Sequence, residues 1–218
     1  MTPDELYASW VEQLDGIAND LIVLHHHRQI WRRVGEITQA ADLPPSAFFD
    51  ALSAWYATSQ MTAIRRLVDR DQRALSLTRL LDDLIRHPTV IGRERHVALW
   101  LRDPAFEWTE RDGRASYDRF ADASGEQLDV AAVEADRERA VEAADAIKRY
   151  VDQRVAHRDL QPVAEVPTWG EVDTAIDTLA EIVNRYSSLF KASSYAFFEP
   201  VIQYDWEAPF RQAWLPAH

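Results

Sequence analysis

A long amphipathic segment near the start of the chain constrains the fold more than any other feature. Large apolar residues recur every three or four positions within residues 3–40, which is the spacing of one buried face of an α-helix. The series consists of Leu6, Trp10, Leu14, Ile17, Leu21 and Leu24, with Ile22 beside it. The pattern therefore predicts a single long helix over residues 3–40 with one buried side.

The composition favours helices for the rest of the chain as well. Only six glycines occur in 218 residues, too few for a turn-rich β-sandwich or for most glycine-rich phosphate-binding loops. Hydrophobic residues make up 47% of the chain, which is enough for a substantial core. We therefore expect an all-α protein in which residues 1–218 form a single helical bundle of about five main helices.

Prolines and helix caps place the boundaries of the later helices. The segment 43–46, Leu-Pro-Pro-Ser, ends the first helix because proline lacks the backbone donor and restricts the residue before it. A T-x-x-E capping box, Thr168 to Glu171, opens the last helix. The predicted helical regions are Ala47 to about Arg86, Gly92–Arg102, Leu128 to about His157, and Thr168 to about Phe190. Within the second region, the residues expected to face inward are Phe48, Leu52, Trp55, Ile64 and Leu67.

Two segments lack a helical pattern. Residues 103–127 contain Pro104, Gly113 and Gly125 without a clear period, and we expect a long central loop with at most short helical turns. Residues 191–218 are rich in aromatic side chains and are expected to form an extended tail. Two roles are open for this tail, namely a strap over the core of its own chain or a contact with a partner or a second copy.

The charges are unevenly distributed. The net charge of −12 argues against binding nucleic acid through overall charge. Acidic residues crowd residues 134–145, and we expect them either to repel nucleic acid or to face a basic partner. Basic residues form two groups: Arg28, Arg32 and Arg33, and then Arg65, Arg66, Arg70, Arg73 and Arg79. Each group fits either a solvated face with ion pairs to Asp69 and Glu36 or a groove that follows phosphates.

Targeting and metal-binding signals are weak. The segment MTPDELYASW is acidic, unlike a signal peptide, and no apolar run approaches the about 20 residues that span a bilayer. We therefore expect a cytoplasmic protein without a membrane partner, and the absence of cysteine suits a reducing compartment. The consecutive His25, His26 and His27 would point about 100° apart on a helix, so they cannot all bind one ion. We predict no metal site and no cofactor.

Residues 157–160, His-Arg-Asp-Leu, match the first four letters of the protein-kinase catalytic loop. A kinase needs an asparagine five residues after the loop aspartate to bind metal, and here that position is Ala164. The chain also lacks a D-F-G triplet after the loop and a G-x-G-x-x-G segment before it. These absences argue against a kinase.

The longer segment Val151–Asp159, VDQRVAHRD, resembles the signature of the HEPN superfamily, and within it the AbiU-type abortive-infection proteins of bacteria. Residues 67–71, LVDRD, with the leucines at 75–81 resemble a second block of that family. The resemblance implies a HEPN-like bundle that acts as a metal-independent endoribonuclease in phage defence or a toxin–antitoxin system. It also implies a homodimer, RNA as a partner, and an antitoxin or other defence protein as a further partner.

The resemblance assigns roles to individual residues. His157 takes the position of the general acid and base, and Asp152 that of the polar residue that orients the histidine or the phosphate. The family's arginine falls at Val151 or Asp152, and neither is basic. Arg154, on the same helical face as His157, is then the candidate for stabilising the phosphorane. The residues expected to bind RNA are Arg158, Arg65, Arg66, Arg70 and Arg73.

The missing arginine leaves a second interpretation open. In it, the fold is a catalytically eroded module that binds nucleotides or proteins within a defence system. Val151 also continues an apolar series along the helix, which predicts that its side chain is buried. That series consists of Val130, Val133, Ala140, Ala144, Ile147 and Val151.

Overall fold

The computed structural model describes residues 1–41, 45–102, 108–155 and 165–212. Within these residues the α-helices are α1 (Pro3–Ala40), α2 (Ala47–Leu67), α3 (Leu77–Arg86), α4 (Arg93–Trp100), α5 (Thr109–Asp118), α6 (Val130–Tyr150) and α7 (Trp169–Lys191). A π-helical turn (Val151–Val155) follows α6 directly, and a short 3-10 helix (Ala208–Arg211) lies near the end. The prediction of an all-α fold is confirmed.

The long N-terminal helix begins and ends where the sequence predicted. Its first turn is capped by Thr2, whose hydroxyl accepts from the backbone N–H of Glu5, while the Glu5 carboxylate accepts from the backbone N–H of Thr2. Trp10, Leu14 and Ile17 of the predicted apolar series are fully buried. The period of large apolar side chains was therefore sufficient to define this helix and its inner face.

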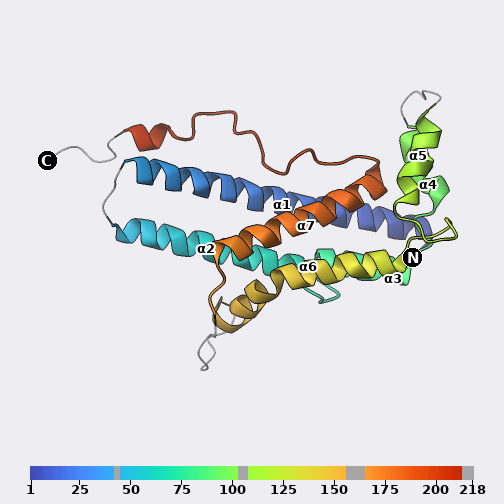
Figure 1. Cartoon of the computed structure of the whole chain (residues 1–218), viewed down its shortest axis with the longest axis horizontal. Coiled ribbons are helices and arrows are strands. Elements are labelled where there is room, and N and C mark those ends of the chain that lie inside the picture. Colours follow the sequence, from blue (N-terminus) through green and yellow to red (C-terminus); the bar gives the residue numbers. More distant parts are fainter. Residues whose placement is uncertain (42–44, 103–107, 156–164, 213–218) are drawn as a thin grey trace.

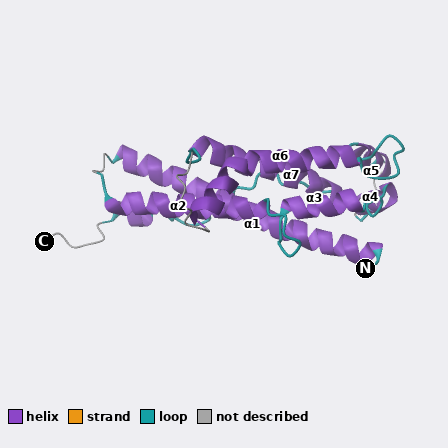
Figure 2. Cartoon of the chain, turned by 90° about the horizontal axis from the view of Figure 1, so that it is seen from below, coloured by secondary structure: helices purple, strands orange, loops and turns teal. Residues whose placement is uncertain are grey.

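The helices α1, α2, α3, α6 and α7 run along the long axis of the molecule (Figures 1 and 2). α1 packs against α2, α3 and α7, and α6 packs against α2, α3 and α7. α4 and α5 pack against each other at one end of the bundle, where α4 also touches α7 (Figure 1). This arrangement leaves the C-terminal end of α6 beside the last turns of α2.

The second predicted helix is two helices in the structure. Residues 68–76 separate α2 from α3, and Ser76 caps α3 by accepting from the backbone N–H of Arg79. The hydroxyls of Ser76 and Thr78 both donate to the backbone carbonyl of Asp69, which fixes the break. Short polar side chains compete with helical backbone bonds in this way, so the helix stops although its apolar period continues.

The predicted inner face of α2 is confirmed at one end only. Ile64 and Leu67 are fully buried, but Phe48 is 51% exposed and Trp55 is 64% exposed. These two aromatic residues lie in the N-terminal half of α2, away from the C-terminal turn where Arg65 meets Asp152. The prediction that they face inward is therefore wrong.

The expected loop at residues 103–127 contains a ten-residue helix, α5. Its buried residues are mostly small, namely Thr109, Gly113 and Ser116, and the one large member is Tyr117. The Tyr117 hydroxyl donates to the backbone carbonyl of Ile91 over 2.8 Å. The helix was not predicted because a face built from small residues and glycine gives no hydrophobic period.

The later boundaries agree well with the sequence. The capping box of Thr168 and Glu171 is present at the start of α7, which continues one residue past the predicted end at Phe190. The helix predicted from Leu128 to about His157 is α6, and its hydrogen bonding changes at Val151 to that of a π-helix. Val133, Ala140, Ala144 and Ile147 of its apolar series are buried, as is Val151.

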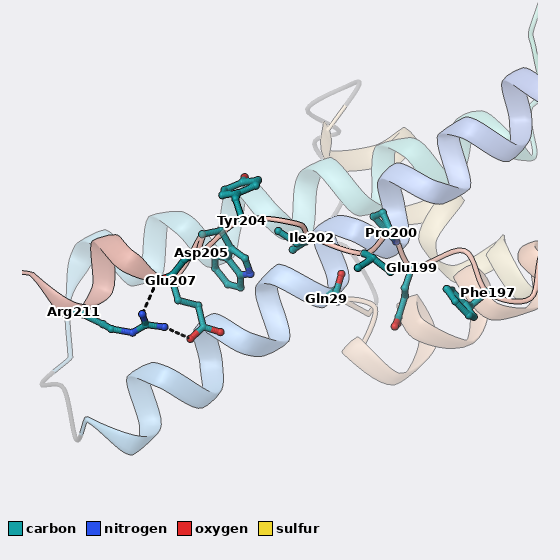
Figure 3. A pocket seen from close by; sticks show the side chains of 11 residues that line it. Gln29, Phe197, Glu199, Pro200, Ile202, Tyr204, Asp205, Glu207 and Arg211 are labelled. Atoms are coloured by element: carbon teal, nitrogen blue, oxygen red, sulfur yellow. Dashed lines mark hydrogen bonds and ion pairs between the residues drawn. The ribbon is translucent and has the colours of Figure 1, made fainter.

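The tail turns back at Ala192, which has a left-handed backbone (φ 51°), and residues 193–212 then run along α1 (Figure 1). Phe198 is buried against the His25 ring, and Glu207 binds Arg33 of α1. Figure 3 shows the groove along this tail, where Arg211 reaches Asp205 and Glu207. The described part of the tail is therefore a strap over its own chain, although several apolar side chains of the strap stay exposed.

Candidate functional site

The residues that resemble the family signature begin at the C-terminal end of α6. Val151–Val155 form one π-helical turn, in which backbone bonds run from residue i to i+5 rather than i+4. Single π turns inside or beside α-helices often occur at functional sites. Val151 is 2% exposed and belongs to the main apolar core, so the first residue of this turn serves packing.

Asp152 is held by two cations from different elements. Its carboxylate accepts from Nε of Arg65 on α2 over 2.9 Å and from Nζ of Lys148 on α6 over 2.8 Å. Partial burial raises the pKa of Asp152, but the hydrogen bonds from Lys148 and Arg65 outweigh it and bring the pKa below the ordinary value of 3.8. At neutral pH this carboxylate is therefore ionised and serves as an acceptor, not as a proton donor.

Arg65 links Asp152 to a second carboxylate. Its guanidinium also pairs with Asp69 one helical turn further along, and the hydrogen bond to Asp152 raises the pKa of Arg65 above its ordinary value. We call Arg65, Asp69, Lys148 and Asp152 the Asp152 network. Its side chains are roughly one-quarter to one-half exposed, so the network is open to solvent.

Of the other predicted catalytic residues, the structure describes only Arg154. Arg154 is exposed on the same π turn as Asp152. His157 and Arg158 lie outside the described residues. The expectation that Arg154 shares a helical face with His157 therefore stays a prediction.

The second group of arginines does not form one strip. Arg65 points to Asp152, whereas Arg66 reaches across to Asp20 on α1 over 3.0 Å. Arg73 pairs with its neighbour Asp71, and Arg70 is exposed in the segment between α2 and α3. Arg65 and Arg66 thus reach different helices, and the Arg65–Asp69 pair is the one expected for a solvated face. RNA binding by these residues stays a prediction.

A cavity lies beside the same end of α6. It has a volume of about 560 Å³ and is lined by Arg149, Tyr150 and Gln153 on one side and by the start of α7 on the other. The capping Glu171 and Thr168 belong to that second side. The capping box predicted the start of α7, but no pattern in the sequence predicted that this start lies beside the end of α6.

The consecutive histidines 25–27 do not share one environment. His25 is buried, its Nδ1 accepts from Arg28 over 2.9 Å, and its ring stacks on Phe198. Burial, followed by the charge of Arg28, lowers the pKa of His25 below its usual value. Among the described residues there is no group of three or more histidine, cysteine, aspartate or glutamate side chains that could hold a metal ion.

One carboxylate was assigned to the wrong environment. Asp136 was grouped with the acidic residues expected to repel nucleic acid, but it is 3% exposed in the structure. It accepts from the Tyr186 hydroxyl over 3.2 Å and pairs with Arg139 and Arg185. The error arose because Asp136 interrupts the apolar series, and its partner Tyr186 lies on another helix.

Comparison with known proteins gives one match. A family model described as AbiU2, a HEPN type, matches residues 7–208. No curated protein and no solved structure matches the chain. No helix in the part of the chain that the structure describes is long and apolar enough to cross a membrane.

Proposed function

Because the chain belongs to the AbiU2 family of HEPN-type abortive-infection proteins, we propose that it is a metal-independent endoribonuclease of a bacterial defence or toxin–antitoxin system. The substrate is RNA, and the 2′-hydroxyl of one nucleotide attacks the adjacent phosphorus. The bond from phosphorus to the 5′-oxygen then breaks, which leaves a 2′,3′-cyclic phosphate and a 5′-hydroxyl. His157 takes the proton from the 2′-hydroxyl or delivers one to the leaving oxygen.

The observation that carries this proposal is the Asp152 network at the end of α6. Asp152 stands in the polar position of the family motif and is ionised between Arg65 and Lys148. An ionised carboxylate can orient a histidine or hold a cation beside a phosphate, and both tasks suit general acid–base cleavage of RNA. Arg154 lies on the same turn as Asp152 and carries a third positive charge in addition to those of Arg65 and Lys148.

The proposal extends to assembly and setting. We expect a homodimer in which two motifs face one cleft, an antitoxin or other defence protein as a further partner, and action in the cytoplasm. Residues 1–218 would then act as one HEPN-like domain. The arginines expected to contact RNA are Arg158, Arg65, Arg66, Arg70 and Arg73.

The test is RNA cleavage by the purified protein. Wild type should cut a single-stranded RNA in the presence of excess EDTA and leave 2′,3′-cyclic phosphate ends, detected by mass spectrometry of the fragments. His157→Ala should abolish cleavage because it removes the group that moves the proton. A substrate with a 2′-deoxy nucleotide at the cleavage site should resist cutting, since the attacking hydroxyl is absent.

A catalytically eroded binding module is the second candidate, and the burial of Val151 favours it. The family's arginine falls at this position or the next, and Val151 is packed in the core. A module of this kind would bind RNA or a nucleotide without cutting it. Wild type and His157→Ala would then give the same affinity in a binding titration and no cleavage in the assay above.

A further inference from the structure

The family motif requires a cation close to the phosphate, and the first turn after α6 does not supply it at Val151. That side chain is 2% exposed among apolar residues, where a guanidinium would lose its hydration without gaining a partner. Asp152, the next residue, is itself an anion. If the site cuts RNA, the positive charge comes from a residue other than these two, either Arg154 of the same turn or a cation from another helix.

We propose that Arg65 of α2 supplies this cation, with Asp152 as the residue that positions it. This inference rests on the proposed ribonuclease function and names a residue that the motif does not contain. Arg65 and Asp152 are 87 residues apart in sequence, yet Nε of Arg65 lies 2.9 Å from Oδ1 of Asp152. The guanidinium is thereby attached to the turn that carries the family signature.

Arg65 keeps donors for a ligand. A guanidinium has five N–H donors, of which Nε is used by Asp152 and Nη1 by Asp69. Among the residues that the structure describes, none accepts a hydrogen bond from Nη2 of Arg65. The side chain is 31% exposed, so these remaining donors are within reach of a phosphate from solvent.

Lys148 reinforces the site from the other oxygen of the same carboxylate. Its Nζ lies 2.8 Å from Oδ2 of Asp152 and the side chain is 44% exposed. A phosphate placed over Asp152 would therefore meet N–H groups of both Arg65 and Lys148. Arginine suits the central position because its planar fork can contact two phosphate oxygens, whereas lysine acts as a point charge.

Burial and position distinguish Arg65 from the other arginines nearby. Arg66 is the next residue, but it points to Asp20 on α1 and away from the end of α6. Arg65 is also fixed by two carboxylates, and the hydrogen bond to Asp152 raises the pKa of Arg65, so its charge is permanent. A cation held in this way can stabilise the charge that develops on the phosphorane without moving.

The test compares Arg65 with an ion pair of similar exposure elsewhere in the bundle. Arg137 of α6 binds Asp82 of α3 over 2.7 Å, and both partners are about one-quarter exposed. We expect Arg65→Ala to lower kcat for RNA cleavage roughly 100-fold, because the loss of one hydrogen-bond donor to the transition state typically has an effect of this size. The change in KM should be smaller. Arg137→Ala should leave kcat within about twofold of wild type, because it lies far from the motif along α6.

Arg65→Lys separates chemistry from folding. It retains the positive charge but not the fork, so kcat should fall by at least about tenfold while the denaturant midpoint stays near that of wild type. If Arg65→Ala does not fold, this variant decides the question. A kcat equal to wild type in Arg65→Lys and in any folded Arg65→Ala would overturn the inference.

The two proposals fail in different ways. Wild type that cuts no RNA would overturn the ribonuclease and the role of Arg65 together. Wild type that cuts RNA, with His157→Ala inactive and Arg65→Ala at full rate, would retain the ribonuclease and reject Arg65 alone. An active wild type with both variants impaired and Arg137→Ala unaffected supports both proposals.

Discussion

Asp136 and Asp152 lie on one continuous helical segment, and each carboxylate is bound by two basic side chains, but their surroundings differ. Asp136 is buried, and its oxygens accept from Tyr186 and pair with Arg139 and Arg185. Asp152 is about one-third exposed and holds Arg65 and Lys148, both of which reach solvent. The first carboxylate is itself buried and the second is itself open to solvent, whereas the cations of both groups are partly exposed.

The difference teaches how a structural ion pair can be told from a candidate site. The hydroxyl of Tyr186 is committed to Asp136, and burial followed by the nearby Asp136 charge raises the pKa of Tyr186. Arg139 and Arg185 are 50% and 39% exposed, but the carboxylate between them is inaccessible to a ligand. Around Asp152 the carboxylate itself is about one-third exposed, and Arg65 and Lys148 each have more N–H donors than their bonds to carboxylates use.

The largest effect on stability is expected from Asp136→Ala. Removal of the carboxylate leaves the Tyr186 hydroxyl buried without its acceptor and separates Arg139 and Arg185 from their shared partner. We expect the free energy of unfolding to fall by roughly 3 kcal/mol, measured by urea denaturation. A loss below about 1 kcal/mol would mean that the buried Asp136 stabilises the protein no more than an exposed carboxylate does.

His96 tests how strongly complete burial of an ionisable side chain affects the stability of the protein. Its ring is fully buried, Nδ1 lies 2.8 Å from the Leu189 carbonyl, and Nε2 accepts from Trp100. Burial lowers the pKa of His96 below its usual value of 6.5, so the unfolded chain binds a proton that the folded chain does not. The free energy of unfolding should therefore be independent of His96 above pH 6.5. Below that pH it should decrease because of this one group, by at most about 1.4 kcal/mol per pH unit.

The measurement is the unfolding free energy of wild type and His96→Gln between pH 7.5 and 5. His25 and His27 also have lowered pKa values, mainly because of burial, and they contribute to the slope of both proteins. The smaller slope expected for His96→Gln isolates the buried ring. Parallel curves for the two proteins would show that His96 takes up its proton in the folded state.

Asp152→Asn should cost little stability and much activity. The carboxylate is about one-third exposed, so we expect a loss of about 1 kcal/mol or less at neutral pH. Because the pKa of Asp152 is lowered in the folded protein, this contribution is present above pH 3.8 and disappears as the pH falls further. The same variant should reduce RNA cleavage, since Arg65 loses the group that positions it.

The smallest effect is expected from Asp145→Ala, which removes a fully surface pair with Arg149 on the same helix. Both side chains are more than half exposed, and we expect a change within about 0.5 kcal/mol in the unfolding free energy. This variant sets the baseline for the series along α6. A loss as large as that of Asp136→Ala would mean that exposure does not order these carboxylates.

The sequence predicted those features that depend on local pattern. The apolar period of Trp10, Leu14 and Ile17 identified α1, and the Thr168 capping box identified the start of α7. The break between α2 and α3 was missed because Leu67 and Leu77 continue the apolar pattern across it, while two hydroxyls end the helix. Hydrogen bonds from side chains to a backbone carbonyl cannot be predicted from the spacing of apolar residues.

The candidate site was predicted in part. The described part of the signature segment lies at the end of α6, as expected, but Asp152 and Arg65 are distant in sequence, and only packing of α2 on α6 brings them together. Spacing along one helix favoured Arg154 instead, because it was the nearest basic residue. The burial of Asp136 was likewise invisible, since an aspartate among other acidic residues resembles a solvated face.

The break after α2 has a consequence for the entropy of binding. The backbone carbonyl of Asp69 is fixed by the hydroxyls of Ser76 and Thr78, while its carboxylate and that of Asp152 hold the Arg65 guanidinium. An arginine side chain carries about 2 kcal/mol of rotamer entropy, and most of it is already lost here when the protein folds. A phosphate that binds Arg65 therefore meets a side chain in its final geometry and does not bear that entropic cost again.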